Sequence, residues 1–378
     1  MRYAFFIIIF LLLQLFSTGA ALSLQWWLQP WITPTLQIAI WSAIFIITNG
    51  LLILSVKRVF ANSYRWVSGW MLVMHFMLLT ALLITLFYGG YWLVTSLLGA
   101  SSYESNMIFI GLRALALVIF LGLFGFALYS AYVPVVRKLS ISINKPLAKP
   151  LRIAVASDLH LGRLFGVAAI DRLNCLMIDS QADMLLMPGD IMDDNTDAFN
   201  SYNMAKNLAQ LCSSLPYGVY ATLGNHDLYG HEQPISQALV DAGVHLLNDD
   251  VFGIEHEGQP IWLVGRFDNH KHQRVATTDL LANVDTSQLV ILLDHRPSDI
   301  DEHSQLPIDL QVSGHTHNGQ VFPANFIVSA INRLGYGYEA IGRGHFVVSS
   351  GYGFWGIPFR LGSRSEIWLI TVSDHTNK

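Results

Sequence analysis

Apolar residues dominate the first part of the chain, where they form four long runs. A helix needs about 20 apolar residues to cross the hydrocarbon layer of a bilayer. The first three runs contain no charged residue, and the fourth carries Arg113 near its start, from where the side chain can reach an interface. The sequence therefore predicts four transmembrane helices, at residues 4–24, 36–56, 67–88 and 107–132.

Beyond residue 150 the pattern changes to short apolar runs that alternate with helical patterns. This alternation predicts an α/β fold class, with two packed mixed β-sheets flanked by helices. The predicted strands are 152–157, 184–187 and 218–223, a hairpin of 254–256 with 261–265, and 289–293, 310–313, 346–349 and 367–372. The predicted helices are 167–180, 198–211 and 234–242.

Between these two parts lies the stretch Asn144–Pro150, which reads NKPLAKP. Two prolines and two lysines within seven residues are typical of a stiff, polar linker. We therefore predict a membrane domain at 1–143, a linker at 144–150 and a second domain at 151–378.

Charge divides the chain at the same place. The whole sequence is 52% hydrophobic and only 13% charged, too apolar for a purely soluble protein. Residues 1–150 contain nine basic residues and one acidic residue, whereas the remainder carries a net charge of −13. Because proteins that bind nucleic acids normally present a basic surface, this acidic domain argues against a nucleic-acid partner.

The placement of Lys and Arg predicts the orientation in the membrane. The loop after the second run contains Lys57, Arg58 and Arg65, and the stretch after the fourth run is also basic, whereas loops 25–35 and 89–106 contain neither residue type. Since basic loops stay inside, we expect a multi-pass integral membrane protein whose N-terminus and second domain are cytoplasmic. The first run also fits a cleaved signal peptide, which would leave this orientation unchanged.

Polar residues of the kind that bind metals follow five of the predicted strands directly. Ligands of open α/β sheets gather beyond the carboxyl ends of strands, so these residues are predicted to share one rim. Asp158 with His160, and Gly189-Asp190, are ordinary alone, because an Asp or Gly after a strand commonly forms a turn. The third motif, Gly224-Asn225-His226-Asp227, is equally open to a functional and a structural interpretation, because a turn needs no histidine between Asn and Asp. All five together, in this order, favour a functional site. They are Asp158 with His160, Gly189-Asp190, Gly224-Asn225-His226-Asp227, Asp294-His295 and Gly314-His315-Thr316-His317.

The series D-x-H, G-D, G-N-H-D, H and G-H-x-H resembles the signature of the calcineurin-like metallophosphoesterase superfamily. Every signature position is occupied, and the resemblance covers most of 151–378. Residues 314–320 (GHTHNGQ) and 351–367 (GYGFWGIPFRLGSRSEI) are similar to a membrane-anchored branch of that superfamily. One departure is Asn318, where the pattern has glycine, but Asn tolerates a positive φ.

The resemblance implies a binuclear metal centre. Two divalent ions about 3.5–4 Å apart neutralise phosphoryl oxygens and activate a hydroxide that attacks the ester. By resemblance, Asp190 bridges the two ions. Mixed nitrogen and oxygen ligands suit Mn, Fe, Zn or Co. The remaining ligands would be Asp158, His160 and His317 for one ion, and Asn225, His295 and His315 for the other.

The resemblance also implies roles for residues outside the metal sites. His226 corresponds to the family's proton donor to the leaving oxygen, and Asp227 would orient it and keep it protonated. Arg360 is a candidate for binding the phosphate of the substrate, the alternative being an exposed surface arginine.

Together these features predict a membrane-anchored, metal-dependent phosphoesterase that hydrolyses a phosphodiester, phosphomonoester or pyrophosphate bond. A membrane tether raises the local concentration of lipid-borne substrates, so a lipid-linked substrate is the preferred class. A soluble small-molecule phosphodiester is the enzymatic alternative, and a catalytically dead membrane scaffold is the non-enzymatic one. The aromatic stretch 352–359 would either meet an acyl chain or belong to the core.

Overall fold

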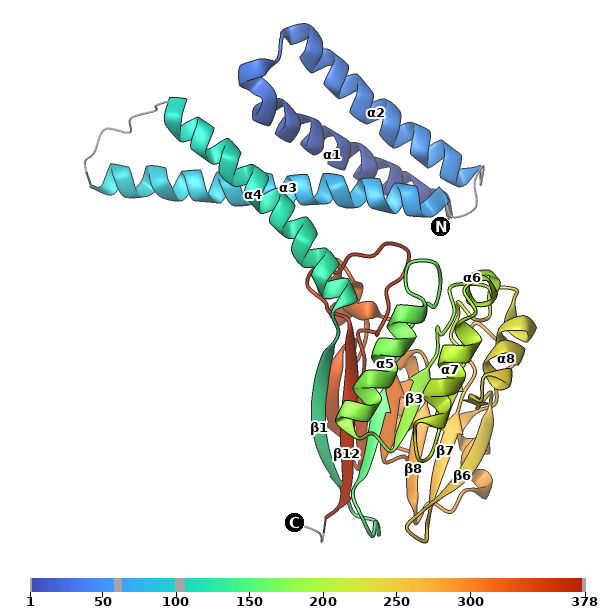
Figure 1. Ribbon diagram of the computed structural model, residues 1–378. Coiled ribbons are helices and arrows are strands. Elements are labelled where there is room, and N and C mark those ends of the chain that lie inside the picture. Colours follow the sequence, from blue (N-terminus) through green and yellow to red (C-terminus); the bar gives the residue numbers. More distant parts are fainter. Residues whose placement is uncertain (1, 58–62, 99–105, 376–378) are drawn as a thin grey trace. The chain divides into compact units, whose positions relative to one another are not determined.

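The computed structural model describes residues 2–57, 63–98 and 106–375. The chain divides into two compact units, Met1–Ala127 and Leu128–Lys378 (Figure 1). Arg58, one of the basic residues on which the predicted orientation rests, lies outside the described residues.

The first unit is helical. It contains α1 (Arg2–Leu28), the short η1 (Gln29–Trp31), α2 (Pro34–Val56), α3 (Ser63–Leu97) and most of α4 (Asn106–Tyr132). Three helices among the described residues are long and apolar enough to cross a membrane, namely Pro34–Val56, Tyr64–Leu97 and Asn106–Tyr132. The first predicted segment is also helical, but its crossing of the membrane stays a prediction. Helix α3 continues to Leu97, nine residues beyond the expected end of its segment.

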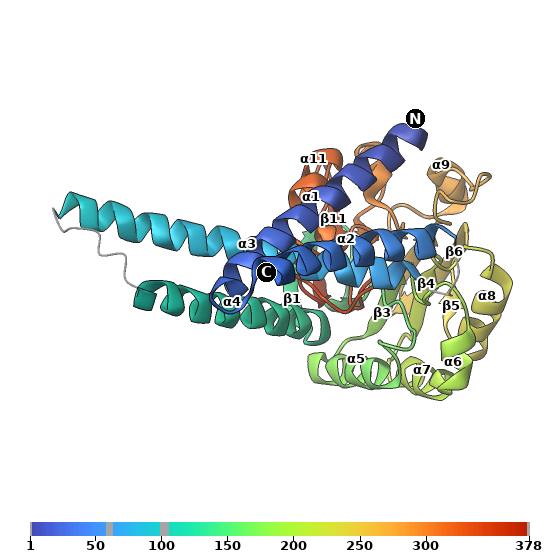
Figure 2. The same ribbon diagram turned by 90° about the horizontal axis from the view of Figure 1, so that it is seen from above.

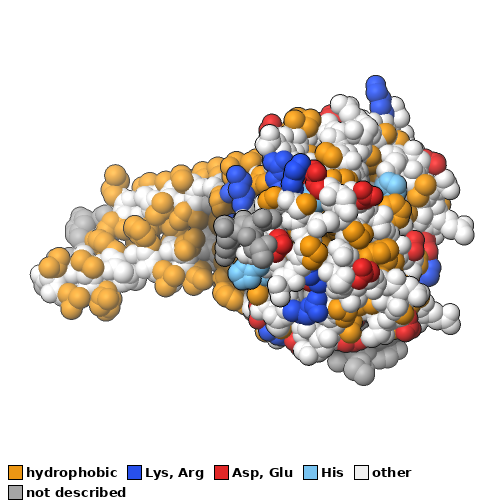
Figure 3. Space-filling model, turned by 90° about the horizontal axis from the view of Figure 1, so that it is seen from below, with side chains coloured by type: hydrophobic (Ala, Val, Ile, Leu, Met, Phe, Trp, Pro, Cys, Tyr) orange, Lys and Arg blue, Asp and Glu red, His pale blue; other side chains and the backbone are white. Residues whose placement is uncertain are grey.

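Side chains of the first unit are apolar outside and include paired polar groups inside. Figure 3 shows hydrophobic side chains covering the part of this unit that is visible in that view. In the interior, Ser17 Oγ donates to Thr48 Oγ1 at 3.0 Å, and Trp70 Nε1 donates to the same oxygen at 2.8 Å. Such hydrogen bonds hold helices together where apolar surface alone gives no preference for protein over lipid. Arg113 donates from Nε to the carbonyl oxygen of Trp26 at 3.1 Å.

The second unit contains two six-stranded mixed sheets, as the sequence predicted. The first sheet has the order β1 (Val135–Ile143), β12 (Glu366–Asp374), β2 (Leu151–Val155), β3 (Met184–Pro188), β4 (Val219–Thr222) and β5 (His245–Leu246). The second has the order β10 (Gly337–Ile341), β11 (Gly344–Val348), β9 (Leu310–Ser313), β8 (Leu289–Leu293), β7 (Gln259–Gly265) and β6 (Asp250–His256).

The core of this unit lies between the two sheets and on their outer faces. In β8, Leu289, Ile291 and Leu293 point into the layer between the sheets, while Val290 and Leu292 join a smaller outer cluster. Both faces are covered, which explains why the strands read as continuous apolar runs. The outer face of the first sheet is covered by α5 (Val167–Ser180), α7 (Met204–Ser213) and α8 (Glu232–Asp241), as Figures 1 and 2 show.

Shorter helices occupy the connections. They are α6 (Asp197–Ser201), α9 (Thr277–Leu280), η2 (Leu281–Asn283), η3 (Pro297–Asp299), α10 (Ile300–His303), η4 (His317–Gly319) and α11 (Ala324–Ile331).

The second unit begins earlier than the sequence suggested. Strand β1 precedes the predicted linker and pairs in parallel with β12 along its whole length. Arg137 on β1 forms an ion pair with the buried Glu366 at 3.1 Å. Within the predicted linker, Lys145 is buried against Asp309. The boundary therefore differs from the expected 144–150, because basic residues that resemble a membrane-flanking loop have partners inside the fold.

Candidate metal centre

The structure brings all seven predicted metal ligands to one edge of the two sheets. Each ligand follows a strand: β2, β3 and β4 of the first sheet, and β8 and β9 of the second. The strands that carry the ligands run parallel within each sheet, so their carboxyl ends lie at one edge. We call this edge the metal rim. It contains Asp158, His160, Asp190, Asn225, His295, His315 and His317.

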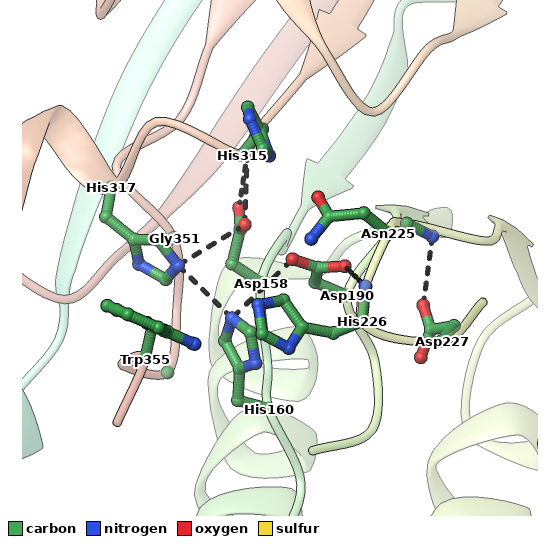
Figure 4. Close-up of polar contacts among 12 residues, drawn as sticks. Asp158, His160, Asp190, Asn225, His226, Asp227, His315, His317, Gly351 and Trp355 are labelled. Atoms are coloured by element: carbon green, nitrogen blue, oxygen red, sulfur yellow. Dashed lines mark hydrogen bonds and ion pairs between the residues drawn. The ribbon is translucent and has the colours of Figure 1, made fainter. Parts of the chain in front are cut away.

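The first group of ligand atoms consists of Asp158 and His160, which follow β2, and His317, which begins η4. His317 Nε2 lies 3.5 Å from Asp158 Oδ1 and 3.2 Å from His160 Nε2 (Figure 4). All three residues are buried. Their ligand atoms all lie within 4.8 Å of one another, close enough for a single cation to contact all three.

A second group joins Asp190 to the second sheet. His295 Nε2 lies 3.3 Å from Asp190 Oδ2, and His315 completes a set whose ligand atoms lie within 4.8 Å of one another. Asp190 Oδ2 is also 3.8 Å from His160 Nε2, in the first group. Asp190 thus stands between the two groups, where a bridging ligand is required.

The fourth ligand expected for the second group, Asn225, fits a metal by its hydrogen bonds. Its amide nitrogen donates to Tyr229 Oη at 2.9 Å, which fixes the side chain. Its Oδ1 is buried and has no hydrogen-bond partner among the described residues. A buried carbonyl oxygen without a partner costs about 1–3 kcal/mol, and a cation would remove that cost. The residues present therefore fit two divalent ions held by nitrogen and oxygen ligands.

The backbone at the rim is strained. Five of the seven ligands adopt a left-handed φ of 45–70°, which is uncommon for residues other than glycine. Such residues cost about 1–3 kcal/mol each and gather at functional sites. The five are Asp158, His160, Asp190, His315 and His317.

Glycines of the motifs allow the ligands to approach the backbone. A Cβ on Gly224 would lie 2.2 Å from Asp190 Oδ1, and one on Gly314 would lie 2.2 Å from Asp158 Oδ2. Any side chain at either position would displace a ligand. This explains the G-N-H-D and G-H-x-H motifs in physical terms.

The histidines differ in protonation because their neighbours differ. Burial lowers the pKa of His160 and of His315 to about 3, so both rings keep a free lone pair. Burial opposes the charged form of His295 too, but the charge and hydrogen bond of Asp190 raise its pKa to about 10. A metal ligand must be a neutral imidazole, so binding through His295 releases a proton.

Comparison with known proteins agrees with this geometry. Residues 151–319 match the model of the calcineurin-like phosphoesterase family. An uncharacterized metallophosphoesterase of Aquifex aeolicus is 31% identical over 250 residues, covering 64% of this chain and 93% of that protein. The chain belongs to the calcineurin-like phosphoesterase family. Members of this family are hydrolases that act on phosphoester bonds.

Two further relatives are longer than the matched region. An uncharacterized metallophosphoesterase of Helicobacter pylori is 32% identical over 243 residues, covering 62% of each chain. A Danio rerio protein named transmembrane protein with metallophosphoesterase domain is 30% identical over 250 residues, covering 63% of this chain and 55% of that one. The chain therefore spans less than two thirds of the length of these relatives.

His226, the residue that corresponds to the family's proton donor, lies beside the metal rim but outside both ligand groups. Its Nδ1 lies 2.5 Å from Asp194 Oδ1, and its backbone N–H donates to Asp190 Oδ1 at 2.8 Å. Burial opposes the charged form of His226, but the hydrogen bond that its ring donates to Asp194 and the charge of nearby carboxylates raise its pKa above the ordinary value. Asp194 is therefore a site residue that sequence analysis missed, since a run of acidic residues before a helix resembles a solvated cap.

Asp227 does not contact the His226 ring as expected of an orienting residue. Its buried carboxylate accepts the backbone N–H groups of Ile191, Met192 and Gly224 at 2.9–3.1 Å. It contributes to the raised pKa of His226 only through its charge. Asp227 thus holds the turn after β3 against the turn after β4, which keeps Asp190 and Asn225 together.

Arg360 is neither exposed nor directed at a substrate. Its side chain is completely buried, and Nη2 donates to His317 Nδ1 at 3.0 Å and to the carbonyl oxygen of Ser350 at 2.6 Å. Nη2 also donates to the carbonyl oxygen of Gly353 at 2.7 Å. The geometry therefore contradicts the expected phosphate-binding role and makes Arg360 a support for a ligand.

A cavity of about 310 Å³ opens over the ligands. Asp190, Asn225 and His317 line this cavity, together with Tyr229 and Trp355. Of the aromatic stretch that sequence analysis left undecided, Tyr352 and Phe354 are core residues, whereas Trp355 is 45% exposed.

Proposed function

We propose that this protein is a membrane-anchored, metal-dependent phosphoesterase. One observation supports this most directly: Asp190 lies between two groups of buried ligand atoms, at 3.3 Å from His295 and 3.8 Å from His160. Two divalent ions held there would neutralise phosphoryl oxygens and activate a water molecule for attack. The mixed nitrogen and oxygen ligands favour Mn, Fe, Zn or Co as the ions, without selecting one of these four.

Residues of the chain would perform the remaining steps. His226 lines the same cavity as several of the ligands, and its contact with Asp194 favours the protonated ring, so it is placed to donate a proton to the leaving oxygen. Asp227 and Arg360 hold ligands in position and take no part in proton transfer.

The membrane helices of the first unit favour a substrate that is carried by a lipid. Three helices among the described residues are long and apolar enough to cross a bilayer, and α1 is proposed as a fourth span. The orientation we propose places the second unit in the cytoplasm, because basic residues flank the second and fourth segments. A tethered catalytic unit meets lipids at high local concentration, so the proposed substrate carries its phosphodiester, phosphomonoester or pyrophosphate bond on a lipid.

The test is hydrolysis of a chromogenic phosphodiester by the full chain in detergent, with added Mn²⁺. Activity should depend on Mn²⁺ and should be lost in Asp190→Asn, which removes the shared carboxylate without changing its size. Asp179→Asn makes the same change on an exposed part of α5 and should retain activity. Activity in Asp190→Asn equal to that of Asp179→Asn would disprove the assigned centre.

The substrate class requires a second comparison. Full chain in lipid nanodiscs would be given a phosphodiester on a lipid and its water-soluble headgroup analogue. A higher kcat/KM for the lipid form supports a lipid-linked substrate, and a higher value for the soluble form supports a soluble one.

A further inference from the structure

Helix α11 (Ala324–Ile331) exposes its apolar side chains. None of its eight residues is buried. Phe326, Ile327 and Ile331 are 64%, 60% and 75% exposed. Single exposed apolar residues are common on soluble proteins, but three large apolar side chains gathered on one short helix with no fully buried residue are not. Such a helix indicates a surface that something else covers.

The topology places α11 at the metal rim. The chain leaves β9 at the rim, through His315 and His317, and α11 follows. It then enters β10, whose first residue Gly337 pairs with Val348, the last residue of β11. Since β11 runs parallel to β9, both ends of the connection lie at the rim.

Helix α11 also packs directly against a ligand-bearing turn. A Cβ on Gly319, the last residue of η4, would lie 2.4 Å from the backbone of Ala324, at the start of α11. The next residue, Gln320, donates from Nε2 to the carbonyl oxygen of Trp355 at 3.0 Å and accepts the Trp355 N–H at 2.9 Å. Trp355 lines the cavity over the ligands. The exposed helix and the cavity wall are thus held by one short segment.

The same rim is where the chain enters the second unit. Val135, the first residue of β1, pairs with Glu366 of β12. Two residues farther along β12, Trp368 pairs with Val155, the last residue of β2. The start of β1 therefore lies at the edge where β2 ends and the ligands begin.

Only two residues, Val133 and Pro134, separate β1 from the end of α4. The last turn of α4 belongs to the second unit, where Ala131 is completely buried and Ser130 accepts the Ser365 N–H at 2.9 Å. The ring of Tyr132 lies 5.3 Å from that of Phe354 in the core. The C-terminal end of a helix long and apolar enough to span a membrane thus enters the second unit at its rim side.

We propose that α11 is a membrane-docking element whose occupant is the acyl-chain region of the bilayer. Phe326, Ile327 and Ile331 would insert beneath the lipid headgroups and bring the cavity to the bilayer surface. The bilayer is favoured over a protein partner because the chain enters this same rim from α4. The inference deepens the proposed function, on which it rests, by stating how a lipid-borne substrate would reach the metal centre.

The test measures lipid contact and does not depend on turnover. Cys175 and Cys212 would be replaced by Ala in the full chain, and a nitroxide would be attached at Ile327→Cys or, as a second position, Ile331→Cys. Ile178→Cys is the matched control, since Ile178 is 59% exposed but lies at the end of α5 that is remote from the rim. In nanodiscs, collision with lipid-soluble oxygen and with a water-soluble nickel chelate would be compared by electron paramagnetic resonance.

Labels on α11 should favour oxygen over the nickel chelate severalfold, relative to the label at 178. Labels that match position 178 would show that α11 faces water, and would overturn the proposal. Labels shielded from both reagents would show that a protein surface covers α11, and would overturn it equally. Loss of Mn²⁺-dependent hydrolysis in Asp190→Asn tests the centre separately, so the two failures can be distinguished.

Discussion

Arg360 offers a direct test of how the metal centre is supported. The guanidinium has only donors, and a ligating histidine normally depends on a partner at its second nitrogen for its orientation. Here the neighbour of His317 Nδ1 is Arg360 Nη2 at 3.0 Å. Because a guanidinium can only donate, the neutral ring carries its proton on Nε2 and must release it when Nε2 binds a metal, which Arg360 favours. We predict that Arg360→Lys weakens metal binding by Asp158, His160 and His317 while leaving the second ligand group less affected.

The magnitude follows from counting hydrogen bonds. Arg360 donates to the carbonyl oxygens of Ser350 and Gly353, to Ser363 Oγ at 3.2 Å and to His317. A lysine ammonium is a single point with three donors, so it leaves some of these buried acceptors without a partner. At about 1–3 kcal/mol for each unsatisfied group, the second unit should lose about 3 kcal/mol of stability. Loss of a residue that orients a ligand typically lowers metal affinity about 10–100-fold.

The assay is a metal titration of the full chain in detergent, in competition with a chromophoric chelator. One of the two equivalents should bind about 10–100-fold more weakly in Arg360→Lys than in the wild type. Arg343→Lys is the control, because the Arg343 side chain is 52% exposed and forms its ion pair with Asp309, which is not a metal ligand. Two equivalents bound with wild-type affinity would refute the positioning role, and equal weakening of both would point to general loss of structure.

Three further predictions follow from the contacts described above. Asp194→Asn should lower the pKa of His226, because the carboxylate raises it; the alkaline limb of kcat should then move to lower pH, with Asp197→Asn as control. Chelation of metal should lower the Tm of the second unit by about 5–10 °C if the metal had been present at about 100 times its Kd, and Asp190→Asn should show no such change. Lys145→Met should destabilise the unit by about 3 kcal/mol in thermal denaturation, because it leaves the buried Asp309 without its main partner. Lys149→Met is the control and should leave the Tm nearly unchanged, because its pair with Glu257 is exposed.

The ligand set was predictable because its signals are local. Each ligand follows a buried strand within a few residues, and parallel strands deliver their ends to one edge without further information. Helix 167–180 and strands 289–293 and 310–313 were predicted with their observed bounds, since apolar patterning alone defines them. Asn318 adopts a φ of 47°, as its tolerance for that conformation suggested.

What the sequence did not reveal depends on contacts between distant residues. Asp194 and His226 are 32 residues apart, and nothing local distinguishes Asp194 from its acidic neighbours. Arg360 is buried among carbonyl oxygens, which no hydrophobic pattern records. The predicted helix 198–211 is interrupted because Asn203 takes a left-handed φ of 52°, which separates α6 from α7.

Two of the elements that sequence analysis missed, β1 and α11, concern the membrane. Strand β1 reads as a basic segment after a span because Arg137 and Lys138 interrupt its apolar residues, yet its parallel pairing with β12 fixes the end of α4 to the rim. Helix α11 contains no fully buried residue, so a search for core-forming patterns has no reason to find it. An apolar helix at the edge where a membrane helix enters needs no protein partner for its exposed side chains if lipid covers them. On this reasoning, the pattern of a soluble protein does not account for the exposed apolar residues of α11, because lipid takes the place of a protein core around them.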